Sequence, residues 1–353
     1  MKILLLPGDG IGPEIMEATE QALAAMNRKY GLGFEMETRD VGEPALASHG
    51  STVPEDLIDH AKNVDAVILG PVDTAAYPLP DQGGINPSAT FRRQLDLYAN
   101  IRPSRSRPGT PALAQMDLVV VRENTEGFYA DRTMFAGSGE FMPTEDLALA
   151  VRKITRQGSE RVVRAACDIA MTRNKRLAIV HKGNVLKQSD GLFLEAAQTV
   201  CAGYPKIEVE EVLVDAMASL LVRDPGAFDV VVSTNMFGDI LSNEAAELSG
   251  GLGLAPSINA GDDYAIAQAS HGAAPDIAGT DTANPTALVV STAMLLDWIG
   301  RRTGENVLVE AAAATEAAVD SLLANVDTRT RDMDGPLGTR AFGDALAKRI
   351  EEA

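Results

Sequence analysis

Short apolar runs alternate with longer amphipathic stretches along the chain. A run of a few aliphatic and β-branched residues is typical of a buried strand, whereas apolar positions that repeat every three or four residues predict a helix. Strands that are each followed by a helix form a mostly parallel sheet with crossover helices, so the pattern predicts an α/β fold. The predicted strands are residues 2–6, 66–71, 118–122, 177–180, 207–214 and 230–232.

Helices are predicted between several of these strands and after the last one. Pro13 stands at a position that favours the start of a helix, and Glu14 suits the positive end of its dipole. The predicted helices run from about residue 13 to 26, 88 to 98, 145 to 172, 285 to 300, 305 to 324 and 338 to 350.

One more helix is predicted after the strand at 230–232, where Gly238 lets the chain turn before the helix opens at Asp239. In open α/β sheets, ligands bind beyond the carboxyl ends of the strands. Asp239 and Asn243 are four residues apart and share a helix face. Their oxygens suit Mg²⁺ or Mn²⁺. On these residues alone, a helix cap at Asp239 and a solvated Asn243 explain the pattern equally well.

Other polar side chains follow the ends of other predicted strands. Arg122 and Tyr129 flank one turn, Lys182 follows the strand at 177–180, and Asp215 follows the strand at 207–214. Each of them, taken singly, reads as an ordinary surface residue. Their shared placement at strand ends indicates one binding crevice.

Three arginines are candidates for that crevice: Arg92 on a predicted helix, Arg102 before a proline, and Arg122. The chain carries a net charge of −19, so an anionic ligand needs a local group of cations. Arginine binds carboxylates in a bidentate manner, and three together indicate a substrate with more than one carboxylate.

The glycines at positions 8, 10 and 12 follow a predicted strand, as in a dinucleotide-binding Rossmann turn. The Rossmann fingerprint requires its third glycine five residues after the first, where this chain has Pro13. We therefore expect an α/β fold that is not a Rossmann fold, with backbone that approaches a ligand at this loop.

Composition excludes several classes of protein. The chain has 353 residues, which suggests two domains or one large unit with a lobe. Its negative charge argues against a general nucleic-acid binder. No apolar run approaches the ~20 residues of a membrane span, and the apolar start is too short for a signal peptide. Cys167 and Cys201 lack metal-site spacing, so we expect a reduced, cytoplasmic protein.

Six blocks of sequence resemble the β-decarboxylating dehydrogenases, the family of isocitrate, isopropylmalate, homoisocitrate and tartrate dehydrogenases. The resemblance runs nearly end to end. It is carried by LPGDGIGPE (6–14), RRQLDLYANIRP (92–103), VRENTEGFYA (121–130), HKGNVLK (181–187), NMFGDILSNEA (235–245) and HGAAPDIAGTDTANP (271–285).

The resemblance implies roles for the polar residues at the strand ends. Arg92, Arg102 and Arg122 correspond to the residues that clamp the substrate carboxylates. Tyr129 and Lys182 correspond to the acid–base pair, and the neighbouring subunit supplies the lysine. The implied partners are therefore a small di- or tricarboxylate and a second copy of the chain in a homodimer with shared active sites.

The implied metal ligands are Asp239, Asp215 from the neighbouring subunit, and the residue at position 243. The family has an aspartate at that position, whereas this chain has Asn243. An amide oxygen still coordinates Mg²⁺ or Mn²⁺, but the site loses one negative charge, so we expect weaker metal binding.

The family's cofactor loop matches residues 271–279. A carboxylate at Asp276 accepts a hydrogen bond from a ribose 2′-hydroxyl and repels a 2′-phosphate, which favours NAD over NADP. Relatives commonly have Phe-Glu-Pro where this chain has Ala267-Gln268-Ala269, a departure near the nicotinamide ribose. The implied cofactor-binding residues are Ile11, Thr74, His271, Gly272, Ala274, Asp276, Ile277 and Asn284.

The family fold has two domains and a mostly parallel central sheet. For this chain it implies an outer, cofactor-binding domain from residues 1–101 and 251–353. It also implies an inner domain, residues 102–250, that forms the dimer and holds the metal and substrate.

Substrate choice in the family depends on the residues just before the first clamp arginine. Isopropyl recognition calls for bulky apolar residues at Ser88 and Ala89, and a homoisocitrate enzyme commonly has an arginine at Ala89. Asn86 and Ser88 are a small polar pair of the kind that isocitrate enzymes use. Both also suit a helix start. We expect an isocitrate-like or tartrate/malate-like substrate, with 3-isopropylmalate or homoisocitrate as the alternative and a non-catalytic regulatory subunit as the third, less favoured class.

Overall fold

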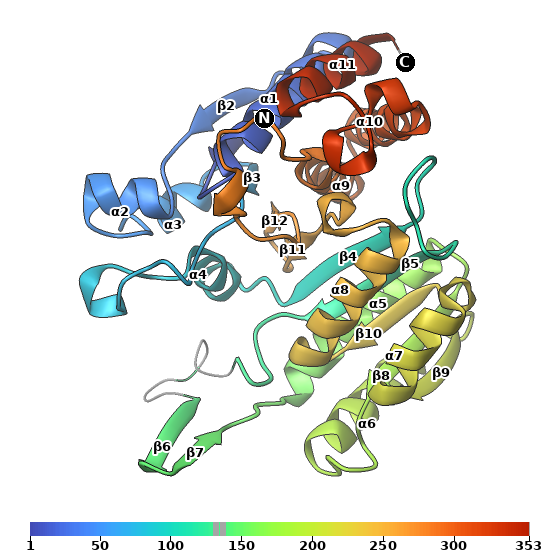
Figure 1. Ribbon diagram of the computed structural model, residues 1–353. Helices are drawn as coiled ribbons and strands as arrows, with labels where there is room; N and C mark the ends of the chain where they lie inside the picture. The colour runs from blue at the N-terminus through green and yellow to red at the C-terminus, as the bar shows by residue number, and fades with distance from the viewer. Residues whose placement is uncertain (130–133, 135–138, 353) are drawn as a thin grey trace.

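The computed structural model describes residues 1–129, 134 and 139–352, so Ala130, the last residue of one family motif, lies outside the described residues. Its main sheet has ten strands in the order β2-β1-β3-β12-β11-β4-β5-β10-β8-β9 (Figure 1). The strands are β1 (Lys2–Leu6), β2 (Glu35–Thr38), β3 (Ala66–Leu69), β4 (Ala99–Arg105), β5 (Asp117–Glu123), β8 (Arg176–His181), β9 (Glu208–Leu213), β10 (Val230–Ser233), β11 (Ile258–Ala260) and β12 (Ala265–Ala267).

The sheet is mostly parallel, as predicted. Strand β4 pairs antiparallel with both β5 and β11, and β11 pairs antiparallel with β12, while the six other pairings are parallel. The antiparallel strands lie in the middle of the sheet. They join the parallel strands that come from the start of the chain to those that come from its centre.

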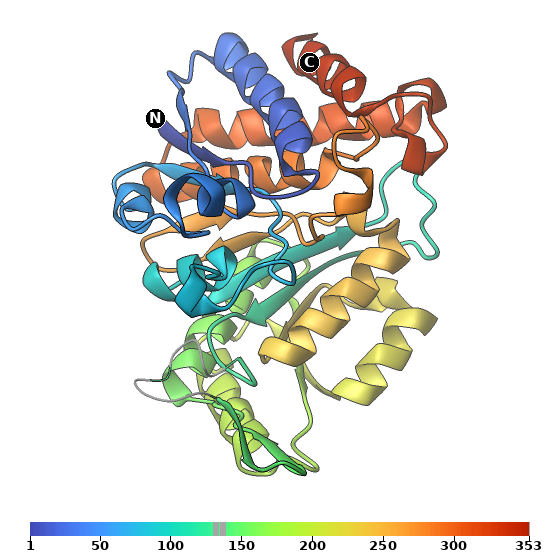
Figure 2. The ribbon, with the colours of Figure 1, turned by 60° about the vertical axis from the view of Figure 1, so that its left-hand side comes forward.

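Helices cover both faces of this sheet. Figures 1 and 2 show α7 and α8 side by side on its lower half, and the helices of the two chain ends at the top. The helices are α1 (Gly12–Tyr30), α2 (Glu43–His49), α3 (Leu57–Ala61), α4 (Pro87–Gln94), α5 (Arg156–Met171), α6 (Ser189–Cys201), α7 (Val214–Arg223), α8 (Asn235–Ser249), α9 (Thr286–Thr303), α10 (Asn306–Ala324) and α11 (Thr339–Glu352).

Four apolar clusters bury the two faces. Successive strand side chains point to opposite faces, and β5 shows this directly: Val119 and Val121 pack with α5 and α6, whereas Leu118 and Val120 pack with α7 and α8. Two clusters take their buried residues from 3–97 and 254–350, and the other two from 99–248. The division into an outer and an inner domain stays a prediction, since one continuous sheet runs through both halves.

The predicted helix at 145–172 is wrong in its first part. Residues 140–150 form a separate hairpin of two exposed strands, β6 (Glu140–Thr144) and β7 (Leu147–Ala150). Leu147 and Leu149 alternate with smaller residues, which is the period of a strand. The helix α5 begins only at Arg156, after Thr155 caps it by accepting a hydrogen bond from Gly158 N at 3.0 Å.

The turn predicted at Gly238 is also wrong, because α8 already begins at Asn235 and Gly238 is a buried helical residue. A Cβ atom at Gly238 would lie 2.8 Å from Cβ of Arg122 and 3.1 Å from its Cα. The glycine is therefore required by the close approach of α8 to β5, which places Asp239 beside the strand.

Two smaller boundaries differ from the prediction. The helix predicted to reach residue 98 ends at Gln94, and the chain turns at Asp96, which has a positive φ of 49°, into the strand β4. Asp215 does not end a strand but is the second residue of α7. The short strands β2, β11 and β12 were not predicted, since three or four residues carry too little periodicity.

The packing at Gly238 predicts a specific loss of stability. Gly238→Ala should push α8 away from β5 and lower the free energy of unfolding by about 1–3 kcal/mol, as overpacking does. The control is Gly191→Ala on α6, where nothing lies within 4 Å of the added Cβ. That variant should be neutral or gain about 0.5–1 kcal/mol from helix propensity. Urea unfolding of both variants gives the change in the free energy of unfolding. An equal change in both would show that the close contact of α8 with Arg122 at Gly238 is not required.

Candidate active site

Two of the three predicted clamp arginines, Arg102 and Arg122, lie on one face of the central strands. Asn100 of β4 is paired with Arg122 of β5, and Arg102 is paired with Val120. Residues that are paired across antiparallel strands share a face, so Asn100, Arg102 and Arg122 point to the side that α8 covers. This explains how the sheet brings together arginines that are twenty residues apart in sequence.

Arg102 and Arg122 converge on one carboxylate, that of Asp239. Nη1 of Arg102 donates to Oδ1 of Asp239 at 3.1 Å, and Nη1 of Arg122 donates to the same oxygen. Arg102 Nη1 also donates to Ser242 Oγ at 2.9 Å and approaches Asn243 Oδ1 at 3.4 Å. The predicted substrate and metal residues are therefore neighbours in the folded chain.

The two guanidinium groups carry more charge than this carboxylate balances. Arg102 and Arg122 are 7% and 3% exposed. Burial, together with the charge of Arg122, lowers the pKa of Arg102 to about 10 although Asp239 opposes the shift. Burial also lowers the pKa of Arg122. Two cations beside one anion leave an excess positive charge, which favours the binding of an anionic ligand.

Arg92 approaches the same face from α4. Its Nε donates to Oδ1 of Asn259 on β11 at 3.1 Å, and Asn124 Nδ2 donates to the same oxygen at 2.9 Å. Asn259 is paired with Asn100, which places it on the face of the sheet that holds the other two arginines. The three arginines thus surround one region, between α4 and α8.

Tyr129 lies next to Arg122, whose guanidinium carbon is 5.6 Å from the centre of the tyrosine ring. The side chain is half-buried. Its position at the end of the turn after β5 places a phenol at the edge of the arginine group, as the acid role requires.

Lys182 and Asp215 form a separate pair. Nζ of Lys182 donates to Oδ1 of Asp215, and this hydrogen bond holds the pKa of the Asp215 carboxyl below its usual range. Asp215 is largely exposed, at the start of α7. Among the described residues, no group of three or more His, Cys, Asp or Glu side chains is arranged to hold a metal ion. Asp239 and Asn243 lie together on α8 beside Arg102, and the chemistry of their two oxygen donors fits Mg²⁺ or Mn²⁺.

The glycine loop lies against the predicted cofactor loop. Ile11 N donates to Ala273 O at 2.8 Å, and a Cβ at Gly10 would lie only 2.0 Å from the same oxygen. Asp9, in the glycine loop, anchors that loop by accepting hydrogen bonds from Glu43 N and Asp73 N at 2.7 and 2.8 Å. The two loops therefore form one backbone surface.

Several predicted cofactor residues border this surface. His271 has its Nε2 buried with no hydrogen-bond partner among the described residues, and burial lowers its pKa. Nothing lies within 4 Å of a Cβ built at Gly272. Asp276 and Thr74 are exposed, Ile11 is buried, and Ala274 and Ile277 are half-buried. The ring nitrogen of His271 without a described partner, next to the uncrowded backbone of Gly272, suits the binding of a nucleotide.

Asn284 is already engaged within the chain. Its Nδ2 donates to Asp332 Oδ2 at 3.0 Å and its Oδ1 accepts from Thr286 N at 3.0 Å. Asn86 likewise caps α4 by accepting from Ala89 N at 3.0 Å, so the helix-start interpretation of that residue is confirmed.

The structure shows contacts of two residues, Gln268 and Asn235, to which the sequence assigned no role. Gln268, which is 8% exposed, donates from Nε2 to Ser88 Oγ at 2.8 Å. Asn235 accepts two hydrogen bonds from Arg122, at 3.0 and 2.7 Å. The departure at Gln268 was visible in the sequence, but its link to the specificity position Ser88 depends on tertiary contacts between residues 180 apart.

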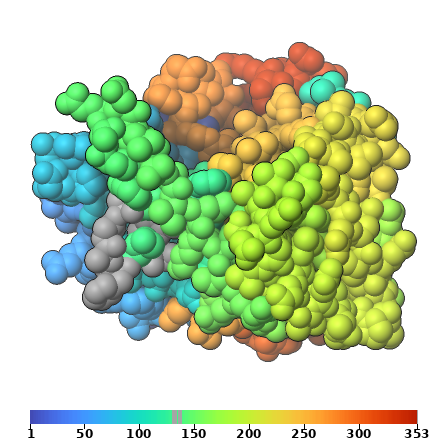
Figure 3. Space-filling model, turned by 90° about the horizontal axis from the view of Figure 1, so that it is seen from below, coloured from blue at the N-terminus to red at the C-terminus, as the bar shows by residue number. Residues whose placement is uncertain are grey.

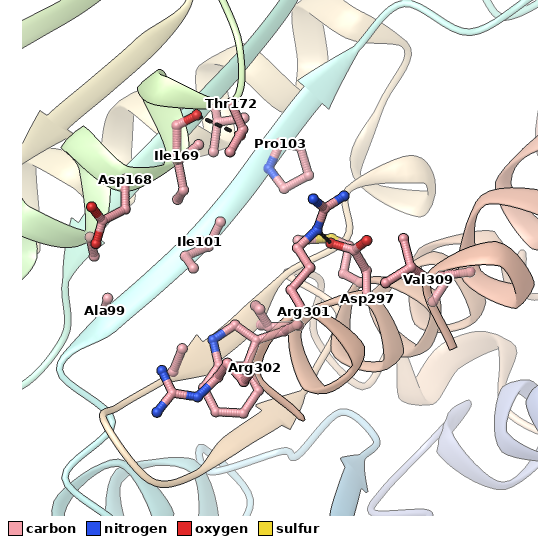
Figure 4. Close-up of a pocket in the computed structure, with 18 of the residues that line it drawn as sticks. Ala99, Ile101, Pro103, Asp168, Ile169, Thr172, Asp297, Arg301, Arg302 and Val309 are labelled. Carbon is pink, nitrogen blue, oxygen red and sulfur yellow. Dashed lines mark hydrogen bonds and ion pairs between the residues drawn. The ribbon is translucent and has the colours of Figure 1, made fainter. Parts of the chain in front are cut away.

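A large cavity of about 920 Å³ lies on the opposite face of the sheet (Figure 4). Ala99, Ile101 and Pro103 of β4 point into it, whereas Asn100 and Arg102 point away from it. Most of its lining between α5 and α9 is apolar or consists of arginines near carboxylates. None of the candidate clamp, acid–base or metal residues lines this cavity, so the candidate active site is a different region of the molecule.

Comparison with known proteins agrees with this geometry. The model of the isocitrate/isopropylmalate dehydrogenase family matches residues 2–346. The chain belongs to this family. Its members are dehydrogenases, so the predicted class, an oxidoreductase enzyme, is confirmed.

Relatives in the family are similar over their whole length. An isocitrate/homoisocitrate dehydrogenase of Thermus thermophilus is 40% identical over 99% of this chain and 98% of its own length. A homoisocitrate dehydrogenase of Methanocaldococcus jannaschii is 39% identical, covering 100% and 98%. A 3-isopropylmalate dehydrogenase of Saccharolobus solfataricus is 36% identical, covering 98% of each chain.

The fold is shared with solved structures of the family. The crystal structure of isocitrate dehydrogenase from Methylococcus capsulatus superimposes with a TM-score of 0.88 and 38% identity, and covers 99% of each chain. The predicted α/β dehydrogenase fold is therefore confirmed. Within the described part of the chain, no helix has the length and apolar character needed to cross a membrane.

The position of Asn243 predicts a change in metal affinity. Asn243→Asp adds one negative charge beside Asp239, which at an effective dielectric of about 20 and after ion dehydration leaves ~1–2 kcal/mol. Mn²⁺ should then bind roughly tenfold more tightly. Titration of Mn²⁺ by electron paramagnetic resonance measures this.

The matched control is Asn306→Asp, which adds the same charge on α10. It should leave Mn²⁺ affinity unchanged, while Asp239→Asn should nearly abolish metal-dependent turnover. An unchanged affinity in Asn243→Asp would show that Asn243 is not a ligand.

Proposed function

We propose that this dehydrogenase catalyses the NAD- and divalent-metal-dependent oxidative decarboxylation of a 3-substituted malate whose substituent bears a carboxylate, as in isocitrate and homoisocitrate. The observation that carries the proposal is the convergence of the buried Arg102 and Arg122, with Arg92 nearby, around a single carboxylate. Excess buried positive charge favours a ligand with several carboxylates over a neutral one.

The residues of the chain divide the chemistry among themselves. The arginines orient the substrate by its carboxylates. Asp239 and Asn243 would hold a Mg²⁺ or Mn²⁺ ion, which would supply a Lewis acid toward the substrate hydroxyl, and the nicotinamide would take the hydride. Lys182 Nζ, in its neutral form, accepts the proton of that hydroxyl. Carbon dioxide then leaves from the β-keto acid and its bonding electron pair stays behind as an enolate. Tyr129 Oη donates a proton to the enolate carbon from which carbon dioxide left.

The substituent pocket supports a polar group. Ser88 and Gln268 are joined by a hydrogen bond on the α4 side of the arginines. An apolar substituent packed against them would displace water from the polar atoms of Ser88 and Gln268, which costs free energy. The names of the relatives favour homoisocitrate or 3-isopropylmalate, the alternatives weighed from the sequence, at least as well as an isocitrate-like or tartrate-like substrate. We therefore keep 3-isopropylmalate as the second candidate.

A second copy of the chain would complete the site. Among the described residues, Asp239 is not grouped with two further acidic, histidine or cysteine side chains, while the exposed Asp215 is paired with the half-buried Lys182. In a two-fold dimer each chain would supply this pair to the other, as the family resemblance implies.

Exposed apolar side chains support such a dimer. The hairpin β6–β7 projects from the molecule (Figures 1 and 3) and exposes Phe141, Met142, Leu147 and Leu149. Val222 on α7 is 62% exposed and Ile240 on α8 is 56% exposed. Apolar groups of this size in contact with water are typical of a surface that another chain covers.

A substrate panel tests the proposed activity. Homoisocitrate, isocitrate, 3-isopropylmalate, malate and tartrate are each supplied with NAD and Mn²⁺, and kcat/KM is measured from NADH formation. Homoisocitrate or isocitrate, whose 3-substituent bears a carboxylate, should be used best. Ser88→Leu replaces a hydroxyl with a larger apolar side chain and should shift the preference toward 3-isopropylmalate by at least about tenfold, the discrimination that a single methylene gives. Wild-type preference for 3-isopropylmalate would support the second candidate, and no turnover with any acid would favour a regulatory subunit.

Cofactor choice gives a second test. The Asp276 carboxylate should cost a 2′-phosphate on the order of 2–3 kcal/mol, so kcat/KM should be one to two powers of ten higher with NAD than with NADP. Asp276→Asn should reduce that ratio, whereas Asp263→Asn, at another exposed carboxylate, should not. Equal efficiency of the wild-type enzyme with both cofactors would contradict the assignment. We also propose a cytoplasmic location, because Cys167 and Cys201 are free thiols, as is usual in a reducing compartment.

A further inference from the structure

A buried ion pair between Arg152 and Asp190 lies outside the residues that the proposed chemistry uses. The Asp190 side chain is 0% exposed and that of Arg152 is 8% exposed. Nη1 of Arg152 donates to Asp190 Oδ1 and also to Ser189 Oγ at 2.8 Å. A buried pair gives little net stability over apolar residues of similar volume, because both ions lose their hydration. Its geometry, rather than its energy, is therefore the feature to explain.

Asp190 contacts the segment that carries Lys182. Its second oxygen, Oδ2, accepts a hydrogen bond from the backbone N–H of Lys182 at 2.5 Å. This is a charge-assisted bond to a buried acceptor, the stronger class of hydrogen bond. The carboxylate thus fixes the main chain at the residue whose side chain pairs with Asp215.

Arg152 contacts the start of α8. Its Nη2 donates to Oγ1 of Thr234, the residue that precedes the helix, at 3.0 Å. Its guanidinium carbon lies 5.3 Å from the ring centre of Phe237, in the first turn of α8. Asp239 follows Phe237 by two residues, so Arg152 holds the end of the helix that presents the proposed metal ligand.

Arg152 also contacts the turn that carries Tyr129. Its guanidinium carbon is 6.0 Å from the ring centre of Phe128. Lys153, the next residue, exchanges two backbone hydrogen bonds with Gly127, at 2.8 and 3.0 Å. The segment after the hairpin β6–β7 is therefore bound directly beside Tyr129.

We propose that the Arg152–Asp190 pair is a positioning unit that fixes the three segments bearing Tyr129, Lys182 and Asp239. In the proposed dimer, Tyr129 and Asp239 of one chain serve one site and Lys182 of that chain serves the other, so the pair positions residues of both sites. Neither residue needs to touch the substrate. The role in catalysis rests on the proposed function, while the role in placing the segments does not. A misplacement of about 1 Å in such a group costs roughly a hundredfold in rate, so a loosened pair should lower turnover more than it lowers binding.

The chain offers a matched control at the other ends of the same strands. Asp229 precedes β10, is 3% exposed, and accepts hydrogen bonds from Arg173 Nε at 2.8 Å and from Arg176 N at 3.4 Å. It is thus also a buried carboxylate that joins an arginine to a backbone N–H. It lies at the opposite ends of β8 and β10 from the proposed site.

The test compares Asp190→Asn and the double variant Arg152→Met/Asp190→Leu with Asp229→Asn. Both changes at Arg152–Asp190 should lower kcat about a hundredfold, while KM for substrate and for NAD changes less than about threefold. The conservative variant Arg152→Lys should keep more of the wild-type kcat than the double variant does. Asp229→Asn should lower thermal stability but leave kcat unchanged. A double variant with wild-type kcat, or an equal kcat loss in Asp229→Asn, would overturn the inference.

Hydrogen–deuterium exchange separates this inference from the proposed function. In the double variant, peptides that contain Lys182 and residues 234–240 should exchange faster than in the wild type, and in Asp229→Asn they should not. This readout needs no substrate, so it holds even if the substrate panel shows no turnover. Unchanged exchange in both peptides would overturn the positioning role.

Discussion

The site depends on two buried guanidinium groups that share one carboxylate. Arg102 and Arg122 are fixed by their strands on the same face of the sheet, and Asp239 reaches them only because Gly238 lets α8 lie against Arg122. Two buried positive charges beside one partly exposed negative charge form a site that an anion or a metal–anion complex completes. This charge imbalance determines the kind of substrate that the crevice can hold.

The proposed sharing of each site by two chains rests on the same geometry. Asp239 and Asn243 lie on α8 beside the arginines, whereas Lys182 follows β8 and pairs with Asp215 at the start of α7, and β10 lies between β8 and β5 in the sheet. The proposed catalysis requires a base and a metal ligand next to the arginines, and the exposed apolar side chains of α7, α8 and the hairpin β6–β7 suit surfaces that meet a second chain.

Much of this arrangement could be predicted from the sequence, because buried parallel strands and long helices leave strong periodic patterns. The family motifs also identify Arg102, Arg122 and Asp239 by position. The strand β4 was missed although Asn100 and Arg102 alternate with apolar residues, because a proline within such a run argues against a strand. The links between Gln268 and Ser88, and between Arg152 and Asp190, join residues far apart in sequence. No local pattern reports such contacts.

The claim that two chains share each site is tested most directly by mixing two inactive variants. One chain carries Lys182→Ala and the other Tyr129→Phe, and the mixture is allowed to exchange subunits. A hybrid dimer would then have one site with both residues intact. Random exchange should restore about a quarter of wild-type activity. No recovered activity in a mixture whose hybrid dimers are demonstrated by native mass spectrometry would contradict the shared site.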